Sequence, residues 1–415
     1  MSIGVSQETA FAGAGSSSEI AAVSLLRNGS TYLWDLKAHR ELYGDLPDLS
    51  GDEIVTMARD AGLTGRGGAG FPTHLKLAAV LAKGGPAVVV ANGSESEPAS
   101  QKDKALMLHR PFLVIEGAWL VARTISASRI YLYTHNYRHI HASLQRALAQ
   151  LRPPGVSIEI ATGPDGYVSG ESSAVVSFLN RGVALPTFTR PIDQGVGGLP
   201  TAVFNVETLA HLANIARTGS SAFRTLGSPA APGSRLLTLS GAVFSPGTVV
   251  ELLHPSPIAE VLMAAGGATD RPVAYLIGGY GGRFTPPMAL LGGEPGGSLG
   301  CGLVGVIPEG ACGLEEARRL FDYLASQSAR QCGPCRFGLP ALQGKLPAAL
   351  GVRPIRRAER AVTRLSREIA GRGGCSHPDA ATAMLQSAIA TFGEELDLHR
   401  NGGCSATRSQ PVFKA

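Results

Sequence analysis

Short apolar runs alternate with amphipathic stretches between residues 87 and 161. The unbroken apolar run at residues 87–91 predicts a buried strand, and residues 129–133 and 156–161 predict two more. Residues 104–124 and 136–151 have the apolar spacing of helices. Strands and helices that alternate in this way predict an α/β fold with a parallel sheet covered by helices.

The pattern changes twice after this region. A segment rich in Pro, Ala and Ser at residues 228–233 predicts a linker. The strand-like and helix-like stretches that follow it predict a small α+β unit, and helical periodicity dominates from about residue 315. We therefore expect five parts: an N-terminal segment (1–50), an α/β domain (51–228), a small α+β domain (234–312), a helical domain (313–400) and a tail (401–415).

Composition excludes several classes of protein. The net charge of +5 comes from interleaved acidic and basic residues, without the basic patches that nucleic-acid binding requires. The longest apolar stretch, residues 112–122, contains Glu116 and is too short to insert into a membrane. The N-terminus lacks the charged and apolar regions of a signal peptide. We expect a cytoplasmic protein whose contact with any membrane is made through partners.

A glycine-rich loop at residues 65–70 carries the first candidate chemistry. Its sequence, Gly-Arg-Gly-Gly-Ala-Gly, fits the pattern G-x-G-x-x-G, although no clear strand precedes it. Glycines allow backbone N–H groups to approach a phosphate, and Arg66 and Lys76 add positive charge. A plain turn is the alternative interpretation.

Three polar segments follow or adjoin the predicted strands: residues 92–98, 167–173 and 204–208. Ligands of open α/β sheets bind at the carboxyl ends of the strands. The Asn, Glu, Tyr and Ser side chains of these segments can therefore meet at one rim and bind polar groups of a ring or ribose.

All six cysteines lie at residue 301 or later. Cys332 and Cys335 form a Cys-x-x-Cys pair, and Cys375 is the next cysteine along the chain. Such a pair suits an iron–sulfur cluster, a zinc site or a redox dithiol. Buried free cysteines are a further alternative.

These segments, in this order, resemble the NADH-binding flavoprotein subunit of respiratory complex I and its relatives in soluble hydrogenases and formate dehydrogenases. The resemblance rests on residues 65–73 with Lys76, residues 92–98, Gly170-Glu171, residues 205–208 and the three cysteines. It implies a Rossmann-like FMN-binding domain, then a β-grasp domain of the SLBB type, then a helical iron–sulfur-binding domain. It also implies FMN as cofactor, NAD(H) as substrate and a [4Fe–4S] cluster.

The resemblance assigns roles to individual residues. Glu97 is the catalytic candidate, which with Phe71 would face the nicotinamide. The remaining candidates for cofactor binding are Gly65, Arg66, Gly67, Gly68, Lys76, Asn92, Ser94, Glu95, Tyr167, Gly170, Glu171, Asn205 and Thr208. The candidate metal ligands are Cys332, Cys335 and Cys375.

The chain departs from the family pattern at several of these positions. Ala329 stands where the family has the first cysteine of its Cys-x-x-Cys-x-x-Cys motif, so three thiols match instead of four. Ser94 and Ser172 replace carboxylates, and Ala79 replaces an aromatic residue. FMN is thus better supported than NADH, and NADH better than a cluster with four cysteine ligands. Candidates for a fourth ligand are Cys301, Cys312, Cys404 and His377, which we rank below an incomplete site.

The resulting functional hypothesis is flavin-dependent electron transfer by an NADH dehydrogenase-like oxidoreductase. Hydride passes from NAD(P)H to FMN, and single electrons pass on to an iron–sulfur centre. The acceptor is a ferredoxin-like or thioredoxin-like iron–sulfur partner. The first alternative is a non-catalytic or repurposed FMN-binding scaffold within a redox complex, with degenerate NADH and cluster sites. The second is a zinc-binding interaction protein, which rests only on the cysteines.

Overall fold

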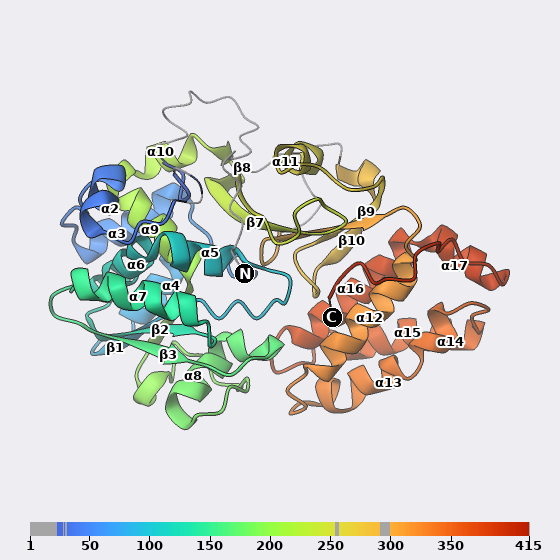
Figure 1. The fold of residues 1–415 in the computed structure, drawn as a ribbon. Coiled ribbons are helices and arrows are strands. Elements are labelled where there is room, and N and C mark those ends of the chain that lie inside the picture. The colour runs from blue at the N-terminus through green and yellow to red at the C-terminus, as the bar shows by residue number, and fades with distance from the viewer. Residues whose placement is uncertain (1–22, 28, 30, 254–256, 291–298, 415) are drawn as a thin grey trace.

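The computed structural model describes residues 23–27, 29, 31–253, 257–290 and 299–414. Residues 1–22 of the predicted N-terminal segment (1–50) lie outside the described residues, as does Ala415. Figure 1 shows an α/β unit (blue to green), a second sheet (yellow) and a helical region (orange to red) that follow one another along the chain. This arrangement confirms the predicted fold class.

The described residues of the α/β unit contain a parallel sheet in the order β3-β2-β1-β4. Its strands are β1 (Ala87–Asn92), β2 (Ala127–Thr134), β3 (Ser157–Thr162) and β4 (Thr201–Asn205). The predicted strands correspond to β1, β2 and β3, whereas β4 was not predicted. Strands β2 and β3 are added on one side of β1, and β4 is added on the other side. The order in which the chain adds strands therefore reverses between β1 and β4. Ligands of such sheets bind at this switch point.

Helices cover both faces of this sheet because side chains of β1 alternate between them. Val89 and Ala91 belong to a core that includes helices α3 (Gly51–Ala61), α6 (Pro111–Thr124) and α9 (Val206–Thr218). Val88 and Val90 face the opposite side, where α8 (Ser172–Arg181) supplies Val175 and Val176. The other helices of this unit are α2 (Leu36–Tyr43), α4 (Thr73–Leu81), α5 (Lys102–His109), α7 (Arg138–Gln150) and α10 (Ser220–Arg224).

The single helix predicted at residues 104–124 is wrong, because the chain bends between α5 and α6. The two helix axes differ in direction by 96°. Arg110 leaves the helical conformation, and Pro111 begins α6, where its missing N–H group costs no hydrogen bond. The buried Arg110 guanidinium donates to the carbonyl oxygens of Arg27, Gly29 and Thr31. No single helix in the described part of the chain is long and apolar enough to cross a membrane, although the bent pair has the combined length and composition.

The predicted linker at residues 228–233 instead contains two short paired strands, β5 (Gly227–Ser228) and β6 (Ala231–Pro232). A mixed sheet in the order β10-β9-β11-β7-β8 follows it. Its central pair, β7 (Ser234–Gly241) and β11 (Leu303–Pro308), is parallel, and the other pairs are antiparallel. Helix α11 packs on one face of this sheet. The remaining elements are β8 (Val249–Leu253), β9 (Pro272–Ile277), β10 (Arg283–Thr285) and α11 (Ile258–Ala264).

The helical region packs against the other face of the mixed sheet. Leu276 and Leu303 of the sheet share a core with Leu320 of α12 and Met384 of α16. The elements of this region are α12 (Gly313–Ser326), the π-turn η4 (Pro334–Gly338), α13 (Leu339–Gln343), α14 (Leu346–Leu350), α15 (Arg356–Ile369), α16 (His377–Thr391) and α17 (Gly393–Arg400).

One buried lysine joins the α/β unit to the mixed sheet. The Nζ atom of Lys102 lies 2.7 Å from Asp103 Oδ1 and 2.8 Å from Glu207 Oε2. Glu207 also accepts the backbone N–H of Leu236 on β7 at 2.8 Å. Burial alone would raise the pKa of Glu207, but the charge of Lys102, together with smaller effects of His211 and Arg66, lowers it. The ion pair therefore holds α5, α9 and β7 together.

We expect Lys102→Met to lower the free energy of unfolding by about 3–5 kcal/mol, because it leaves two buried carboxylates without their cation. The control is Lys37→Met, since the Lys37 side chain is 85% exposed and its pair with Glu41 is a surface pair. That change should cost at most about 1 kcal/mol. Urea denaturation of the flavin-free protein measures both, and equal losses in the two variants would contradict the expectation.

Candidate functional site

The predicted polar segments meet at the carboxyl edge of the parallel sheet. Asn92, at the end of β1, donates from Nδ2 to the carbonyl oxygen of Gly170 at 2.9 Å. Asn205, at the end of β4, donates to Asp103 Oδ2 at 2.6 Å and to the carbonyl oxygen of Asn92 at 3.5 Å. The Asn205 side chain also accepts the Glu207 N–H and so caps α9. Segments far apart in the sequence thus form one rim at the switch point.

The glycine-rich loop lies over the N-terminus of α9. Its ends are joined by a bridge between Thr64 and Pro72 and by the hydrogen bond from Gly65 N to Phe71 O at 2.8 Å. The Arg66 N–H donates to Thr208 Oγ1 at 2.9 Å. A Cβ atom on Gly67 would lie 3.2 Å from Asn205 Cβ, so the loop backbone sits close to the strand edge. A helix N-terminus beside glycine-rich backbone is a favourable anion site.

Two cations, the buried Arg66 and the partly buried Lys76, border this loop, and neither forms a salt bridge with a carboxylate of the described chain. Lys76 Nζ donates to the carbonyl oxygen of Val203 at 2.9 Å and lies 4.8 Å from the centre of the Phe204 ring. Burial lowers the pKa of Lys76 to about 8. Arg66 donates to the carbonyl oxygens of Pro232 and Ser234, and burial lowers its pKa to about 9. A phosphate bound here would stabilise the charged forms of Lys76 and Arg66, which burial disfavours.

Two of the predicted acidic residues cap helices. Glu95, which has a positive φ of 44°, accepts hydrogen bonds from the N–H groups of Asp103 and Lys104 at the start of α5. Glu171 accepts those of Ser173 and Ala174 at the start of α8. In this structure both carboxylates position their loops through the helix starts; their predicted contact with a cofactor stays a prediction.

Glu97 is buried where the α/β unit meets the mixed sheet. Its Oε2 atom accepts the Tyr280 N–H at 2.9 Å, whereas Oε1 has no hydrogen-bond partner among the described residues. Burial raises the pKa of Glu97 to about 8, against weaker opposing effects of Tyr280 and the Tyr167 hydroxyl. A Cβ atom on Gly279 would lie 2.5 Å from Glu97 Oε2 and 2.7 Å from Cys301 Sγ, so only glycine fits there. Nothing in the sequence predicted that Cys301 lies beside Glu97.

The remaining predicted contacts lie on the same rim. Ser94 donates to Asn92 Oδ1 at 2.9 Å, and a Cβ atom on Gly170 would lie 2.3 Å from Ser94 Oγ. Gly68 lies close to the backbone of Cys301, because a Cβ atom on Gly68 would be 3.8 Å from the amide nitrogen of Cys301. The Phe71 side chain is 49% exposed at the end of the glycine-rich loop. These residues therefore lie around the same rim, and their predicted contacts with a cofactor stay a prediction.

The cysteine segment lies directly beside this rim. The Tyr167 ring, next to Glu97, packs against the His377 ring with 5.4 Å between their centres. His377 lies at the start of α16, two residues after Cys375. A Cβ atom on Gly374 would lie 2.8 Å from the Phe188 ring, so the loop after α8 also contacts this segment.

The structure brings the three predicted metal ligands together. Burial raises the pKa of Cys335, and the charges of Cys332 and Cys375 add to this rise, so the three thiols lie near one another. Backbone N–H groups of Gly374 and His377 donate to the sulfur atoms of Cys332 and Cys375. Such hydrogen bonds to sulfur are typical of iron–sulfur sites.

The candidates for a fourth ligand mostly lie elsewhere. Cys301 donates to the carbonyl oxygen of Gly278 at 3.2 Å. Cys312 and Cys404 gather with Glu395 and His399 into a separate group. His377 lies beside Cys375, but its Nε2 atom is bonded to the carbonyl oxygen of Leu324 at 2.9 Å. The site therefore keeps three matching thiols among the described residues.

The residues of both sites fit the groups that the resemblance implied. At the rim, Arg66 and Lys76 form no salt bridge in the described chain and suit a phosphate, glycine backbone leaves room for it, and the Glu97 Oε1 atom has an unmet hydrogen-bonding capacity. At the cysteine segment, thiols with backbone N–H donors suit a sulfide-bridged cluster.

Comparison with known proteins finds two matching family models. The Nuo51 FMN-binding domain matches residues 58–214, and the NADH-ubiquinone oxidoreductase-F iron–sulfur binding region matches residues 315–399. Both matches contain the sites described above. The prediction of an FMN-dependent, NADH-oxidising electron-transfer protein with an iron–sulfur region is confirmed by these matches.

Curated relatives cover most of the chain. The F subunit of the NADH-quinone oxidoreductase of Salmonella typhimurium is 31% identical over 85% of this chain and 85% of its own length. The F 2 subunit of the Rhizobium meliloti enzyme is 31% identical over 87% and 92%. The F subunit of the Mycobacterium tuberculosis enzyme is 30% identical over 85% of both chains.

A solved structure shares the fold of this chain. A chain of the NAD+-reducing [NiFe]-hydrogenase in its H2-reduced state superposes with a TM-score of 0.76 and 28% identity, over 88% of this chain. The present chain spans 64% of that hydrogenase chain. The sequence identity to the F subunits over most of both chains, the matching family models and the shared fold agree. This chain belongs to the family of NADH-quinone oxidoreductase F subunits.

Proposed function

We propose that this chain takes a hydride from NADH at the rim of its parallel sheet and delivers single electrons through its cysteine segment to an acidic iron–sulfur partner. The observation that carries the proposal is the contact between the two sites, in which Tyr167 at the rim packs against His377 beside Cys375. FMN, when bound, supplies the chemistry that converts a two-electron donor into a one-electron donor.

The cations of the rim fix the position of the flavin phosphate in this proposal. Lys76 and Arg66 are held by backbone carbonyl groups, so neither loses an ion-pair partner when an anion arrives. Gly67 and Gly68 keep the loop backbone low enough for close approach. We assign phosphate binding to these residues and to the N-terminus of α9.

Glu97 is proposed to orient the nicotinamide through its free Oε1 atom. Burial keeps the carboxyl neutral over most of the physiological pH range, because the pKa of Glu97 is raised to about 8. A neutral carboxyl donates a hydrogen bond, so Oε1 can hold its proton toward a carboxamide oxygen. The same burial excludes water from this side of the rim.

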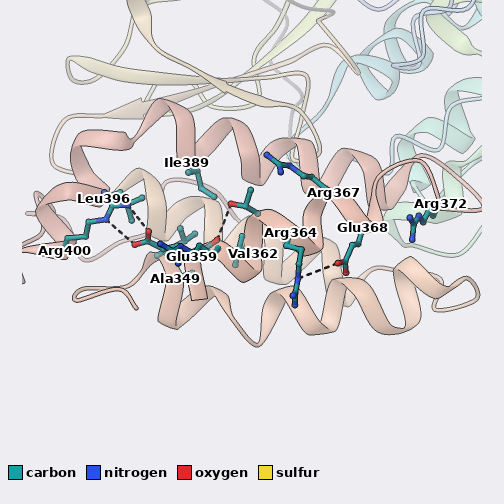
Figure 2. Close-up of a pocket in the computed structure, with 13 residues that line it drawn as sticks. Ala349, Glu359, Val362, Arg364, Arg367, Glu368, Arg372, Ile389, Leu396 and Arg400 are labelled. Atoms are coloured by element: carbon teal, nitrogen blue, oxygen red, sulfur yellow. Dashed lines mark hydrogen bonds and ion pairs between the residues drawn. The ribbon is translucent and has the colours of Figure 1, made fainter. Parts of the chain in front are cut away.

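A basic groove on the helical region is the proposed docking surface for the partner. Figure 2 shows the groove, which has a volume of about 560 Å³ and is lined by α14, α15, α16 and α17. Helix α15 presents exposed arginines along it, and its end packs against η4, which contains Cys335. Arg364 is paired with Glu368, whereas Arg360, Arg367 and Arg372 form no ion pair within the described ranges. Of the groove arginines, Arg360, Arg364 and Arg367 lie on α15, and Arg372 follows the end of that helix.

Positive charge beside the cysteine segment favours an acidic partner, because complementary charge raises the rate of association. Ferredoxin-like proteins and thioredoxin-like iron–sulfur proteins are the proposed classes. A cytoplasmic location, with membrane contact made through partner subunits, belongs to this proposal. The alternative of a repurposed scaffold rests on the missing fourth thiol at Ala329, whereas the cations of the rim and Glu97 are in place.

The flavin site is tested by Gly67→Val. The added side chain begins 3.2 Å from Asn205 Cβ and should displace the loop, which we expect to weaken FMN binding about tenfold or more. Gly393→Val is the matched control, because no atom lies within 4 Å of its added Cβ. FMN fluorescence titration gives the affinities, and anaerobic NADH should bleach the flavin in the wild type. Failure of NADH to reduce bound FMN would falsify the proposed function.

The pH dependence of stability tests the state of Glu97. Its pKa is raised from 4.5 to about 8 on folding, so the folded state binds the extra proton. The free energy of unfolding should therefore fall as pH rises through this window, and Glu97→Gln should flatten the decline. Urea midpoints of the flavin-free protein between pH 5 and pH 9 measure it.

Glu53→Gln is the control for this pH series. Hydrogen bonds from Ser50 lower the pKa of the exposed Glu53, so its contribution is lost only as pH falls through the acid range. The slope between pH 5 and pH 9 should then match the wild type. An unchanged slope in Glu97→Gln would show that Glu97 does not titrate as proposed.

The docking surface is tested by charge reversal at Arg360 and Arg367. The double change to Glu should lower kcat/KM for an acidic [2Fe–2S] ferredoxin about tenfold at low salt, with the difference shrinking as salt rises. NADH oxidation with ferricyanide should stay unchanged. Arg59→Glu, on α3, is the control. A loss of similar size with ferricyanide, or with the control, would count against the groove.

A further inference from the structure

Four potential metal ligands gather at the end of the helical region that lies away from the predicted cluster. They are Cys312, Glu395, His399 and Cys404, and their ligand atoms all lie within 4.8 Å of one another. Cys312 precedes α12, Glu395 and His399 lie one turn apart on α17, and Cys404 lies in the tail. Sequence spacing gives no sign of this group, because folding brings Cys312 to residues about 90 positions later.

The hydrogen bonds of His399 prepare one ring nitrogen for a cation. Its Nδ1 atom lies 2.6 Å from the carbonyl oxygen of Leu350, and a carbonyl can only accept, so Nδ1 carries a proton. In the neutral ring Nε2 then has a lone pair. The Nε2 atom lies 3.0 Å from Glu395 Oε1 and 3.6 Å from Cys312 Sγ. Two electron-rich atoms at 3.0 Å repel each other unless a cation or a proton lies with them.

Both sulfur atoms receive backbone hydrogen bonds. The N–H of Glu315 lies 3.4 Å from Cys312 Sγ, and the N–H of Ala406 lies 3.5 Å from Cys404 Sγ. The Glu395 carboxylate is held by the N–H and hydroxyl of Ser405. Each ligand therefore has a second partner that fixes its orientation, which is a recurrent feature of metal sites.

The turn after α17 places Cys404 beside His399. Gly402 adopts a positive φ of 80°, and the N–H groups of Gly402 and Gly403 bond back to the last turn of α17. The chain reverses there, so Cys404 returns toward the helix that it has just left. Glycine permits this conformation at little cost.

The group is separate from Cys332, Cys335 and Cys375. Cys312 lies at the start of α12, whereas Cys332 follows the end of that helix. A helix of 14 residues is about 20 Å long. One cluster cannot include ligands from both ends.

We propose that Cys312, Glu395, His399 and Cys404 bind a single Zn²⁺ ion in a tetrahedral structural site. Two sulfur ligands, one imidazole nitrogen and one carboxylate oxygen form a donor set that zinc accepts. All four positions are filled by the protein, so the ion has no open position for catalysis.

The ion would fasten the tail to the helical region. Beyond Cys404, the N–H groups of Thr407 and Arg408 bond to the carbonyl oxygen of Gly310, and Phe413 is buried between the mixed sheet and Tyr280. The Tyr280 N–H is the group that holds Glu97. Zinc thus anchors the segment that packs behind the predicted catalytic carboxylate.

Elemental analysis of the purified full chain tests the proposal. We expect about one zinc per chain in the wild type and at least a tenfold lower content in Cys404→Ser, with iron and FMN unchanged. Cys375→Ser should give the opposite result, with iron lost and zinc kept. Because Cys404 is exposed, its replacement by Ser leaves the core intact, and far-UV circular dichroism with FMN content verifies folding.

A second measurement does not depend on the Cys404 variant. Co²⁺ added to reduced Cys375→Ser protein should give the visible absorption of a tetrahedral thiolate site, and a chelator that removes the metal should speed proteolysis within residues 401–414. Zinc that persists in Cys404→Ser overturns the proposal. A Cys312–Cys404 disulfide in the isolated protein also overturns it. So does the absence of both zinc and a cobalt spectrum after reconstitution, because the group would then be only an ion pair between His399 and Glu395.

Discussion

The buried charge of Lys102 determines the arrangement of the whole rim. A lysine with 2% exposure must have acidic partners, and Asp103 and Glu207 provide them from different segments. Asp103 in turn accepts from Asn205, and Asn205 touches the glycine-rich loop at Gly67. The position of the loop over the sheet therefore follows from a single cation in the interior.

The two lysines Lys102 and Lys76 differ in whether the protein itself supplies their counter-charge. Lys102 is compensated by two carboxylates within the protein, and its pKa is raised by them despite burial. Lys76 is partly buried and has a carbonyl oxygen and an aromatic face as neighbours in the described chain, and burial lowers its pKa. A protein that buries an uncompensated cation loses stability in isolation. The most economical explanation is that the missing charge comes from a ligand.

The sequence predicted those features that local pattern encodes. Uninterrupted β-branched residues identified β1, and the order of the polar segments identified the family. The bend at Arg110 was missed, because apolar periodicity continues through it and only the proline marks the break. Strand β4 was missed because its five residues end in the polar cluster that attracted a functional interpretation.

The sequence predicted which segments meet at the rim but not their geometry. Glu95 and Glu171 were recognisable as members of acidic loops, yet which hydrogen bonds a carboxylate accepts depends on the helix that starts nearby. Likewise, the Cys-x-x-Cys pair is visible because its spacing is local. Cys301 beside Glu97 and Cys312 beside His399 arise only from tertiary folding, which sequence spacing does not record.

The Arg110 guanidinium holds residues 27–31 of the N-terminal segment through backbone carbonyl groups. It binds the carbonyl oxygens of residues 27, 29 and 31, which every amino acid presents alike. Thr31 can therefore be replaced while this contact is kept, whereas Gly29 has a positive φ of 57° and the Arg27 side chain binds Leu42 and Asn214. The contact depends on Arg110, since no other side chain offers five donors in one rigid plane. A distant relative that differs at position 31 would thus be compatible with an unchanged fold.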